Sequence, residues 1–124
     1  MYDKSLVLEI VKQIIEAVEI VDERCSPVEN VDYLIDTKDG QKTLDSICMK
    51  LIAVGESLKS IDSITNKELL KEYPQIEWKK IKGIRDFISH HYFDLDAEVI
   101  YEICKNNIDD LLIVLRQIKK DISS

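Results

Sequence analysis

The segment with the greatest potential for chemistry runs from Ile84 to Asp94, reads IRDFISHHYFD and contains both histidines of the chain. Arg85 stands five residues before His90, and Tyr92 follows two residues later. Arginine offers a planar fork of donors that suits phosphate oxygens. Histidine can accept or release a proton near neutral pH. These residue types suit chemistry at a phosphate group, with Arg85 binding the phosphate and His90 transferring a proton.

The geometry of this group depends on whether the segment is helical. Residues four apart share a helix face, so the Asp86 carboxylate is expected beside the His90 imidazole, where it would fix the tautomer and favour the charged form. Arg85 lies about 140° from His90 around the axis, so the two converge only in a cleft, particularly one completed by a second subunit. Spacing leaves an alternative open, because a histidine near a helix C-terminus often only caps free carbonyl groups.

Metal chemistry is disfavoured by the residues around the motif. His91 points to a different face from His90, and we interpret it as structural or solvent-exposed. Neighbouring residues on a helix diverge, and no further ligand set accompanies them, so we expect no metal and no cofactor. Three cysteines are far apart and form no Cys-x-x-Cys pair; they are Cys25, Cys48 and Cys104. We interpret them as small apolar fillers in a reducing cytosol.

Length and charge set limits on the class of protein. A chain of 124 residues suits one domain over residues 1–124, and its net charge of -7 disfavours indiscriminate binding to nucleic acid. A nucleic-acid role needs a local basic patch, and WKKIKGIR supplies Lys79, Lys80 and Lys82 just before the motif. The simpler interpretation of these lysines is a solvated helix face. We expect a cytoplasmic protein with no signal peptide and no membrane-spanning segment, because charged residues interrupt every apolar run.

The pattern of apolar residues predicts an all-α fold. Glycine and proline are scarce, with three and two residues, and apolar positions recur at helical spacing. We expect an up-and-down bundle of four main helices with one or two short extra helices. The main helices are expected over residues 5–23, 40–60, 76–93 and 95–122, and the short ones over 31–35 and 65–73. Asn30 and Asp94 are the expected N-caps of the first short helix and the last helix.

The second main helix carries a glycine, Gly55, in its middle. Glycine there costs about 1 kcal/mol relative to alanine, so we interpret Gly55 as a point where another helix crosses closely. The buried stripe of this helix is expected to contain Leu44, Ile47, Met49, Leu51, Val54 and Leu58.

The stretch from Trp78 to Phe93 resembles the signature of the HepT-like toxins, a branch of the HEPN superfamily. The family pattern is an arginine, a polar residue, three further residues, a histidine, any residue and a tyrosine. The matching positions are Arg85, Asp86, His90 and Tyr92, without departure. The resemblance also takes in Ala53-Val54-Gly55-Glu56-Ser57, Tyr73-Pro74-Gln75-Ile76-Glu77-Trp78 and Phe93-Asp94-Leu95-Asp96, and it spans roughly residues 40 to 115.

This resemblance implies a HEPN-like bundle of four to five helices that forms a homodimer. The Arg and His of both subunits would meet in a composite, metal-independent endoribonuclease site. Arg85 would neutralise the scissile phosphate, and His90 would act as general base or acid when the ribose 2′-hydroxyl attacks. Asp86 would hold His90 in orientation. The three lysines before the motif would guide the RNA backbone, with tRNA or mRNA as the expected substrate.

The resemblance also implies a partner, a nucleotidyltransferase antitoxin of the MntA type that transfers AMP to Tyr92. An AMP group two residues from His90 would bring charge and bulk beside the cleft and compete with RNA for Arg85. A function of another class stays open: a non-catalytic HEPN dimer that binds a nucleotide or the nucleotidyltransferase. The intact motif favours the toxin ribonuclease, since a pure binding module has no need of all four residues. Glu56 fits a solvated helix residue as well as a site contact.

Overall fold

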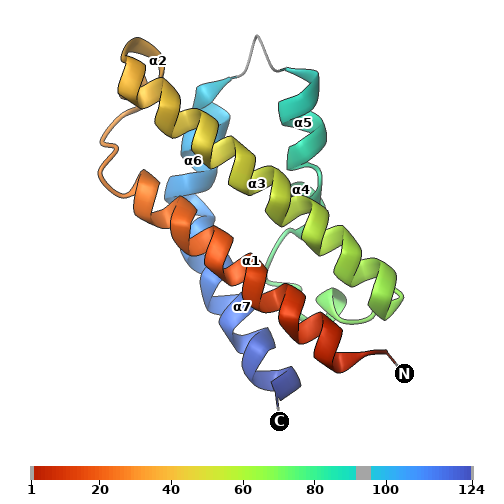
Figure 1. The fold of residues 1–124 in the computed structure, drawn as a ribbon. Helices are drawn as coiled ribbons and strands as arrows, with labels where there is room; N and C mark the ends of the chain where they lie inside the picture. Colours follow the sequence, from red (N-terminus) through yellow and green to blue (C-terminus); the bar gives the residue numbers. More distant parts are fainter. Residues whose placement is uncertain (1, 92–95, 124) are drawn as a thin grey trace.

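The computed structural model describes residues 2–91 and 96–123 of the chain, and over these residues it contains helices and no strand. This confirms the predicted all-α class. Figure 1 shows the elements in order: α1 (Lys4–Cys25), α2 (Val31–Asp36), α3 (Lys38–Thr65), the 3-10 helix η1 (Leu70–Glu72), α4 (Trp78–Lys82), α5 (Ile84–His90), α6 (Ala97–Asn106) and α7 (Ile108–Ser123). None of the described helices is apolar over a length that could cross a bilayer.

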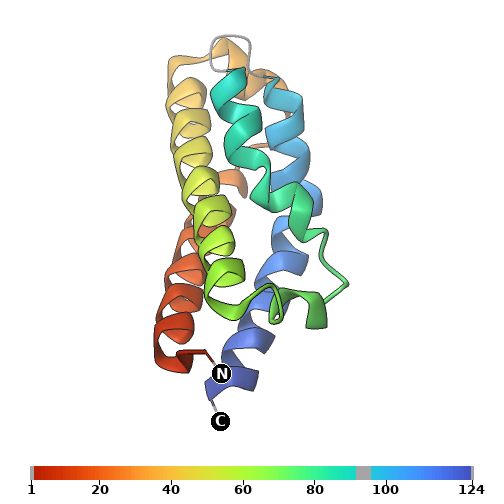
Figure 2. The same cartoon turned by 90° about the vertical axis from the view of Figure 1, so that its right-hand side faces the viewer.

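Four antiparallel columns form the bundle, as predicted. α1 rises, α3 returns beside it, α4 and α5 rise again, and α6 continues into α7 on the way back (Figures 1 and 2). α1 packs against α3 and α7, while the other side of α3 carries α4 and α5. A single buried cluster contains apolar side chains of α1, α3, α4, α5, α6 and α7. The third column is therefore held in place mainly by α3.

Side-chain caps begin four of the helices. Asn30 accepts a hydrogen bond from the Tyr33 amide at 3.1 Å, which confirms the predicted cap of α2. Thr37 accepts from the Gly40 amide at 2.8 Å, so α3 begins earlier than expected. Asp3 caps α1 and Asp96 caps α6 in the same way. The predicted cap at Asp94 and the predicted helix end at Tyr92–Phe93 lie outside the described residues.

Two of the predicted long helices are each divided into two shorter ones. The third column breaks at Gly83, whose backbone lies at φ -81° and ψ -6°, between α4 and α5. The fourth breaks at Asn107, at φ -117° and ψ -26°, between α6 and α7. Both residue types have low helix propensity, glycine through backbone entropy and asparagine because its side chain competes for backbone groups. The prediction of continuous helices was wrong at these two points.

The C-terminal end of α3 extends five residues beyond the predicted Ser60, to Thr65. Asn66 and Lys67 follow with left-handed backbones, at φ 54° and 62°. The Lys67 amide donates to the Asp62 carbonyl at 2.8 Å and closes the helix end. The short helix predicted over residues 65–73 is reduced to the three-residue η1.

The surface and interior of α3 agree with the sequence except at one position. Met49 was placed in the buried stripe, but 70 % of its surface is exposed. It is out of phase with the buried positions at 47, 51, 54 and 58. The interpretation of Gly55 is confirmed, because a Cβ atom there would lie 3.1 Å from the Ile81 carbonyl oxygen and 3.4 Å from Ile84 Cγ2.

The prediction of three free cysteines was also wrong. Cys25 and Cys104 form a disulfide between the end of α1 and α6, with their Cα atoms 6.1 Å apart. That separation lies within the normal range for a disulfide, and only the packing of helices 79 residues apart in sequence creates it. Cys48 remains a free thiol, and burial, with a contribution from Asp45, raises its pKa to about 12.

Candidate functional site

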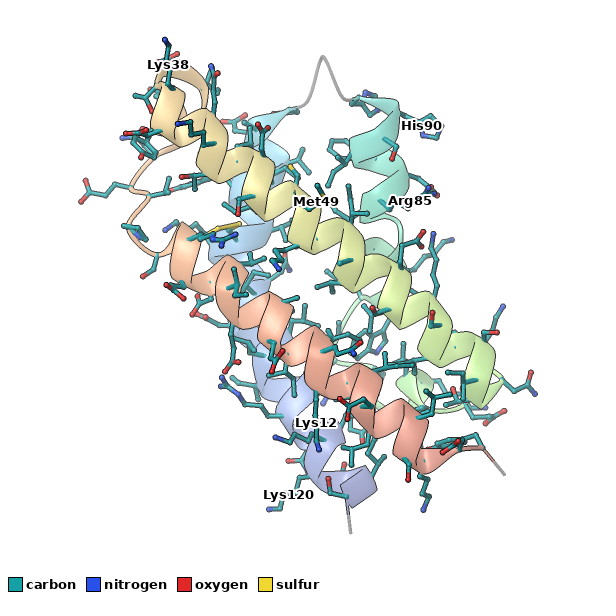
Figure 3. The ribbon with its side chains drawn as sticks, in the orientation of Figure 1. Lys12, Lys38, Met49, Arg85, His90 and Lys120 are labelled. Carbon is teal, nitrogen blue, oxygen red and sulfur yellow. A yellow bond between two sulfur atoms is a disulfide. The ribbon has the colours of Figure 1, made fainter. Side chains whose placement is uncertain are left out.

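The short helix α5 presents the motif on its outer face. Ile84 and Ile88, four residues apart, are buried and anchor α5 against α3. Arg85, Asp86 and His90 are exposed on the opposite side. In Figure 3, Arg85 and His90 project from α5 away from the bundle. The predicted helical placement of these three residues is therefore confirmed.

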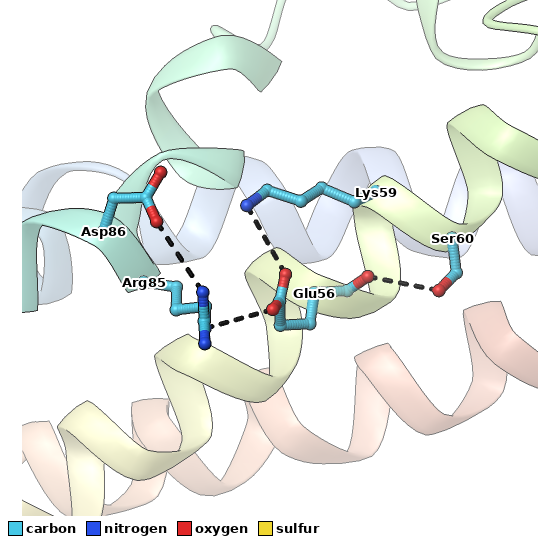
Figure 4. A network of polar contacts seen from close by, with 5 residues as sticks. All are labelled: Glu56, Lys59, Ser60, Arg85 and Asp86. Atoms are coloured by element: carbon cyan, nitrogen blue, oxygen red, sulfur yellow. Dashed lines mark hydrogen bonds and ion pairs between the residues drawn. The ribbon is translucent and has the colours of Figure 1, made fainter. Parts of the chain in front are cut away.

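Arg85 belongs to a network of charged side chains that joins α5 to α3 (Figure 4). Its Nε lies 3.1 Å from Oε1 of Glu56, the residue that follows the helix-crossing Gly55. Lys59 Nζ lies 3.4 Å from the other oxygen of the same carboxylate. Arg85 Nη1 is 3.8 Å from Asp86 Oδ1, a long contact. The close crossing at Gly55 thus positions Glu56 next to Arg85.

The imidazole of His90 is oriented by the main chain. Its Nδ1 lies 2.8 Å from the carbonyl oxygen of Asp86, one helical turn earlier. A carbonyl oxygen only accepts hydrogen bonds, so the contact assigns the proton of a neutral imidazole to Nδ1. The lone pair then resides on Nε2, the nitrogen that can act as a base.

The contact between Asp86 and His90 differs from the expected one. It uses the Asp86 carbonyl group, whereas the nearest recorded partner of the carboxylate is Arg85 Nη1. Any residue at this position would supply the same carbonyl. A role of the Asp86 side chain in orienting His90 stays a prediction.

The remaining relations within the motif are weaker: in the part of the chain that the structure describes, Arg85 and His90 are not bonded to each other, and Tyr92 lies beyond that part. No hydrogen bond or ion pair joins Arg85 to His90 within the described part of the chain. The His91 ring lies beside the Phe87 ring, with 5.0 Å between centroids, which fits its structural interpretation. Tyr92 lies outside the described residues. One chain by itself therefore presents the two main catalytic candidates side by side but not in contact.

The three predicted RNA-binding lysines do not form one uniform patch. Lys82 makes an ion pair with Asp62 of α3, and both side chains are largely buried. Lys79 and Lys80 are exposed on α4. Spacing of three residues places Lys79 on the same face as Lys82, whereas Lys80 lies on another side of the helix.

Two acidic residues near the site carry interactions that were not predicted. The sequence left the role of Glu56 open between a solvated residue and a site contact. Its position directly after a glycine at a helix crossing gave a signal that could have indicated the contact. Asp62 gave none, because its partner Lys82 is 20 residues away. Within the described residues, no group of three or more His, Cys, Asp or Glu side chains could hold a metal ion.

Comparison with known proteins identifies the family of the chain. The family model described as "Ribonuclease HepT-like" matches residues 14–118. A Methanocaldococcus jannaschii protein named "Putative RNase" is 30 % identical over 66 % of this chain and 64 % of its own length. A Thermococcus cleftensis protein named "Probable ribonuclease HepT" is 28 % identical over 81 % of this chain and 84 % of its own.

A third relative, a "Putative RNase" of Caldanaerobacter subterraneus, is 27 % identical over 81 % of this chain and 82 % of its own. The chain spans less than two thirds of the first relative's length. No solved structure matches the chain. The family match covers most of the chain, including α5 with Arg85 and His90, and the chain belongs to the ribonuclease HepT-like family.

Proposed function

We propose that this protein is the toxin of a toxin–antitoxin pair, a cytoplasmic, metal-independent endoribonuclease that cleaves tRNA or mRNA. Its site would be composite, with Arg85 and His90 of two subunits facing each other across a homodimer interface. Membership of the ribonuclease HepT-like family supports the nuclease activity. The geometry of His90 is the observation that carries the assignment of its role.

His90 has the arrangement that a general base requires. Nδ1 is engaged by a main-chain carbonyl, so the outward nitrogen Nε2 is the one free to take a proton. The side chain is exposed and can meet a polymer substrate. In the proposed reaction, Nε2 removes the proton of a ribose 2′-hydroxyl. The 2′-oxygen bonds to phosphorus and the bond to the 5′-oxygen breaks, which leaves a 2′,3′-cyclic phosphate and a 5′-hydroxyl.

Arg85 would stabilise the charge that develops on the phosphate. Glu56 holds the Nε side of the guanidinium and Asp86 makes only a long contact of 3.8 Å with Nη1, so the terminal amino groups can bind the phosphate oxygens. The nucleophile is part of the substrate itself, and a metal-bound water is therefore not required. Protonation of the leaving 5′-oxygen needs a second acid, which His90 of a second subunit would supply.

Two features near the site support a homodimer: the separation of Arg85 from His90 and the exposed side chain of Met49. Arg85 and His90 do not contact each other in one chain, so a second copy would complete the site. Met49 is exposed on α3 and stands seven residues before Glu56, on the same face of the helix. An exposed methionine on the same helix face as a polar site that is incomplete in one chain suits an interface between two copies.

Regulation by a nucleotidyltransferase antitoxin of the MntA type rests on Tyr92. The tyrosine follows His90 by two residues, and AMP attached to its phenol would add negative charge and bulk near Arg85. RNA would then be excluded from the site.

The test is cleavage of total tRNA in the presence of EDTA by wild-type protein and by the His90→Ala variant. Intact mass first establishes that Tyr92 carries no AMP. We expect wild type to cut and the variant to lose at least about 100-fold in rate, the usual contribution of a general base. A cyclic phosphate at the new 3′ end would confirm attack by the 2′-hydroxyl.

Two outcomes would contradict the proposal. Equal cleavage by both proteins would remove His90 from the mechanism. If neither cuts while both stay folded dimers, the chain is better described as a module that binds a nucleotide or the nucleotidyltransferase, and isothermal titration with AMP and ATP becomes the next measurement.

A further inference from the structure

An open groove of about 560 Å³ lies next to the Arg85 network, between the C-terminal half of α3 and α4. It is lined by Lys59, Asp62, Ser63, Asn66, Lys67 and Lys82. Every one of these side chains is polar or charged, and three of them are lysines. We call this feature the lysine groove. Its composition contrasts with the net charge of -7 of the chain.

The negative charge within the lysine groove is already neutralised. Asp62 is paired with Lys82 and is largely buried. Outside the groove, Glu56 is shared between Lys59 and Arg85. Among the described residues, no ion pair is recorded for Lys67. An approaching anion therefore meets the ammonium group of Lys67 and that of Lys59, whose partner Glu56 is shared with Arg85.

Lys67 adopts a backbone conformation that lysine seldom adopts. Its φ of 62° follows that of Asn66 at 54°, so two consecutive residues are left-handed. This conformation costs roughly 1–2 kcal/mol for an ordinary L-residue, and glycine or asparagine would adopt it more readily. A lysine at this position is unfavourable for the backbone alone, and its charge lies on the wall of the groove.

The lysine groove is continuous with the catalytic candidates. Lys59 lines it and also contacts Glu56, which contacts Arg85. Glu56, Lys59 and Ser63 lie three and four residues apart and so share one face of α3. A polar strip therefore leads from Arg85 down α3 to Lys67.

We infer that the lysine groove binds the phosphate backbone of the RNA strand that flanks the scissile phosphate. The inference rests on the proposed ribonuclease function and adds the path of the substrate. An open groove admits a linear polymer, and lysines there offer phosphate contacts independent of base sequence. Ser63 and Asn66 can exchange hydrogen bonds with ribose 2′-hydroxyls. A protein partner fits less well, because the described side chains that line the groove are all polar or charged and offer no apolar anchor.

Binding of a 2′-O-methyl RNA oligonucleotide tests the lysine groove separately from catalysis, since this strand lacks the nucleophile. The variant is Lys59→Gln with Lys67→Asn, which keeps a helix former on α3 and a residue suited to a left-handed backbone. The matched control is Lys12→Gln with Lys120→Gln, on α1 and α7, which removes the same charge from helices that do not line the groove (Figure 3). Fluorescence anisotropy across a salt series gives the affinity.

We expect the groove variant to bind about 25-fold more weakly than the control at ~0.1 M salt, with the two converging near 1 M, because each lost phosphate contact lowers the salt slope by about 0.7. Equal affinity and equal slope in the two variants would overturn the inference, as would the absence of RNA binding by wild type. Cleavage of total tRNA is measured in parallel. If no protein cleaves tRNA but the groove variant binds more weakly than the control, the ribonuclease proposal is rejected and the groove is retained. If wild type cleaves tRNA but the two variants bind equally, only the groove is rejected.

Discussion

Two ion pairs join α3 to the third column of the bundle, and they differ in exposure. Asp62 and Lys82 keep 11 % and 25 % of their side chains exposed, whereas Glu56 and Arg85 keep 44 % and 48 %. Both acids lie on α3, six residues apart, and both bases lie on the α4–α5 segment. The contact of α3 with α4 thus holds one ion pair inside the protein, and its contact with α5 holds the other at the surface.

The Asp62–Lys82 pair maintains the fold, whereas the Glu56–Arg85 pair is open to a ligand. In the less polar surroundings of Asp62, loss of one partner leaves a charge without compensation, which is costly. At the surface, water solvates both partners, and such a pair contributes only about 0–1 kcal/mol. The terminal amino groups of Arg85 can therefore bind a phosphate while Glu56 holds Nε, and loss of the exposed pair has little cost in stability.

The largest expected effect is the loss of RNA cleavage in Arg85→Ala. We expect at least a 100-fold lower rate, about 2.7 kcal/mol or more of transition-state stabilisation, and a free energy of unfolding within about 1 kcal/mol of wild type. Arg116→Ala is the control, since Arg116 forms a similarly exposed ion pair with Glu19 at 3.0 Å, away from the site. Cleavage assays and urea denaturation measure the two quantities. Equal loss of activity in both variants would remove the special role of Arg85.

For the buried pair the expected effect is on stability. Lys82→Met leaves the Asp62 carboxylate without its cation, and we expect a loss of about 2–3 kcal/mol, reduced from the fully buried range because Lys82 is partly exposed. Asp62→Asn should cost less, since the freed lysine can turn toward water. Urea denaturation at fixed protein concentration measures both. A change below about 0.5 kcal/mol in Lys82→Met would contradict the distinction between the two pairs.

Both ion pairs depend on the close crossing of helices at Gly55. The Gly55→Val substitution pushes against the Ile81 carbonyl group, and we expect a loss of about 1–3 kcal/mol through overpacking, together with reduced cleavage. Ala53→Val, at an exposed position of the same helix, controls for the helix propensity of valine. Thermal denaturation compares the two. Equal destabilisation would show that the crossing tolerates a larger side chain.

The contribution of Glu56 is expected to be smaller and confined to activity. Glu56→Ala frees the Arg85 guanidinium, and we expect roughly a tenfold lower kcat, in the range that modest mispositioning causes. Glu56→Gln retains an oxygen that accepts from Arg85 Nε, and it should recover most of the rate. Steady-state cleavage kinetics separate kcat from KM. A higher KM with an unchanged kcat would assign Glu56 to RNA binding instead.

The smallest expected effect lies at the opposite end of the bundle, at Tyr73 and Asp121. The Tyr73 hydroxyl donates to the Asp121 carboxylate, and this bond, with a second from Gln117, lowers the pKa of Asp121 below its ordinary value of 3.8. A lowered pKa stabilises the fold above pH 3.8, and that contribution is lost as the pH falls through the folded value. Tyr73→Phe should lower the stability slightly at pH 7 and flatten its pH dependence below about pH 4, so that the variant and wild type converge in acid. If stability falls equally steeply in the variant and in wild type below about pH 4, the prediction is wrong.

Local sequence signals were enough where a feature depends on neighbours along the chain. The cap at Asn30, the crossing at Gly55 and the inward positions of Ile84 and Ile88 follow from residue type and helical period, and the structure confirms them. Met49 shows the limit of the same method, because an apolar residue out of phase with the stripe was assigned to the core. Gly83 and Asn107 show it again, since low propensity within a periodic pattern does not state whether a helix bends or breaks.

The motif was identified from sequence, but its contacts were not. Neither the Glu56–Arg85 pair nor the Asp62–Lys82 pair could be foreseen, because both depend on the registration of α4 and α5 against α3. The contact between His90 and Asp86 was expected through the carboxylate and is made through the carbonyl. The disulfide of Cys25 with Cys104 likewise depends on helices far apart in sequence.

The sequence by itself determined the all-α bundle, the helical motif with Arg85 and His90, and the resemblance that family comparison confirmed, because each depends on residue type and short-range spacing. Only the tertiary structure decided which charges are buried, which acid contacts Arg85, and that the two catalytic candidates stay apart within one chain. The physical reason is that burial and charge pairing depend on how separate helices dock against each other, and no short-range pattern encodes that registration.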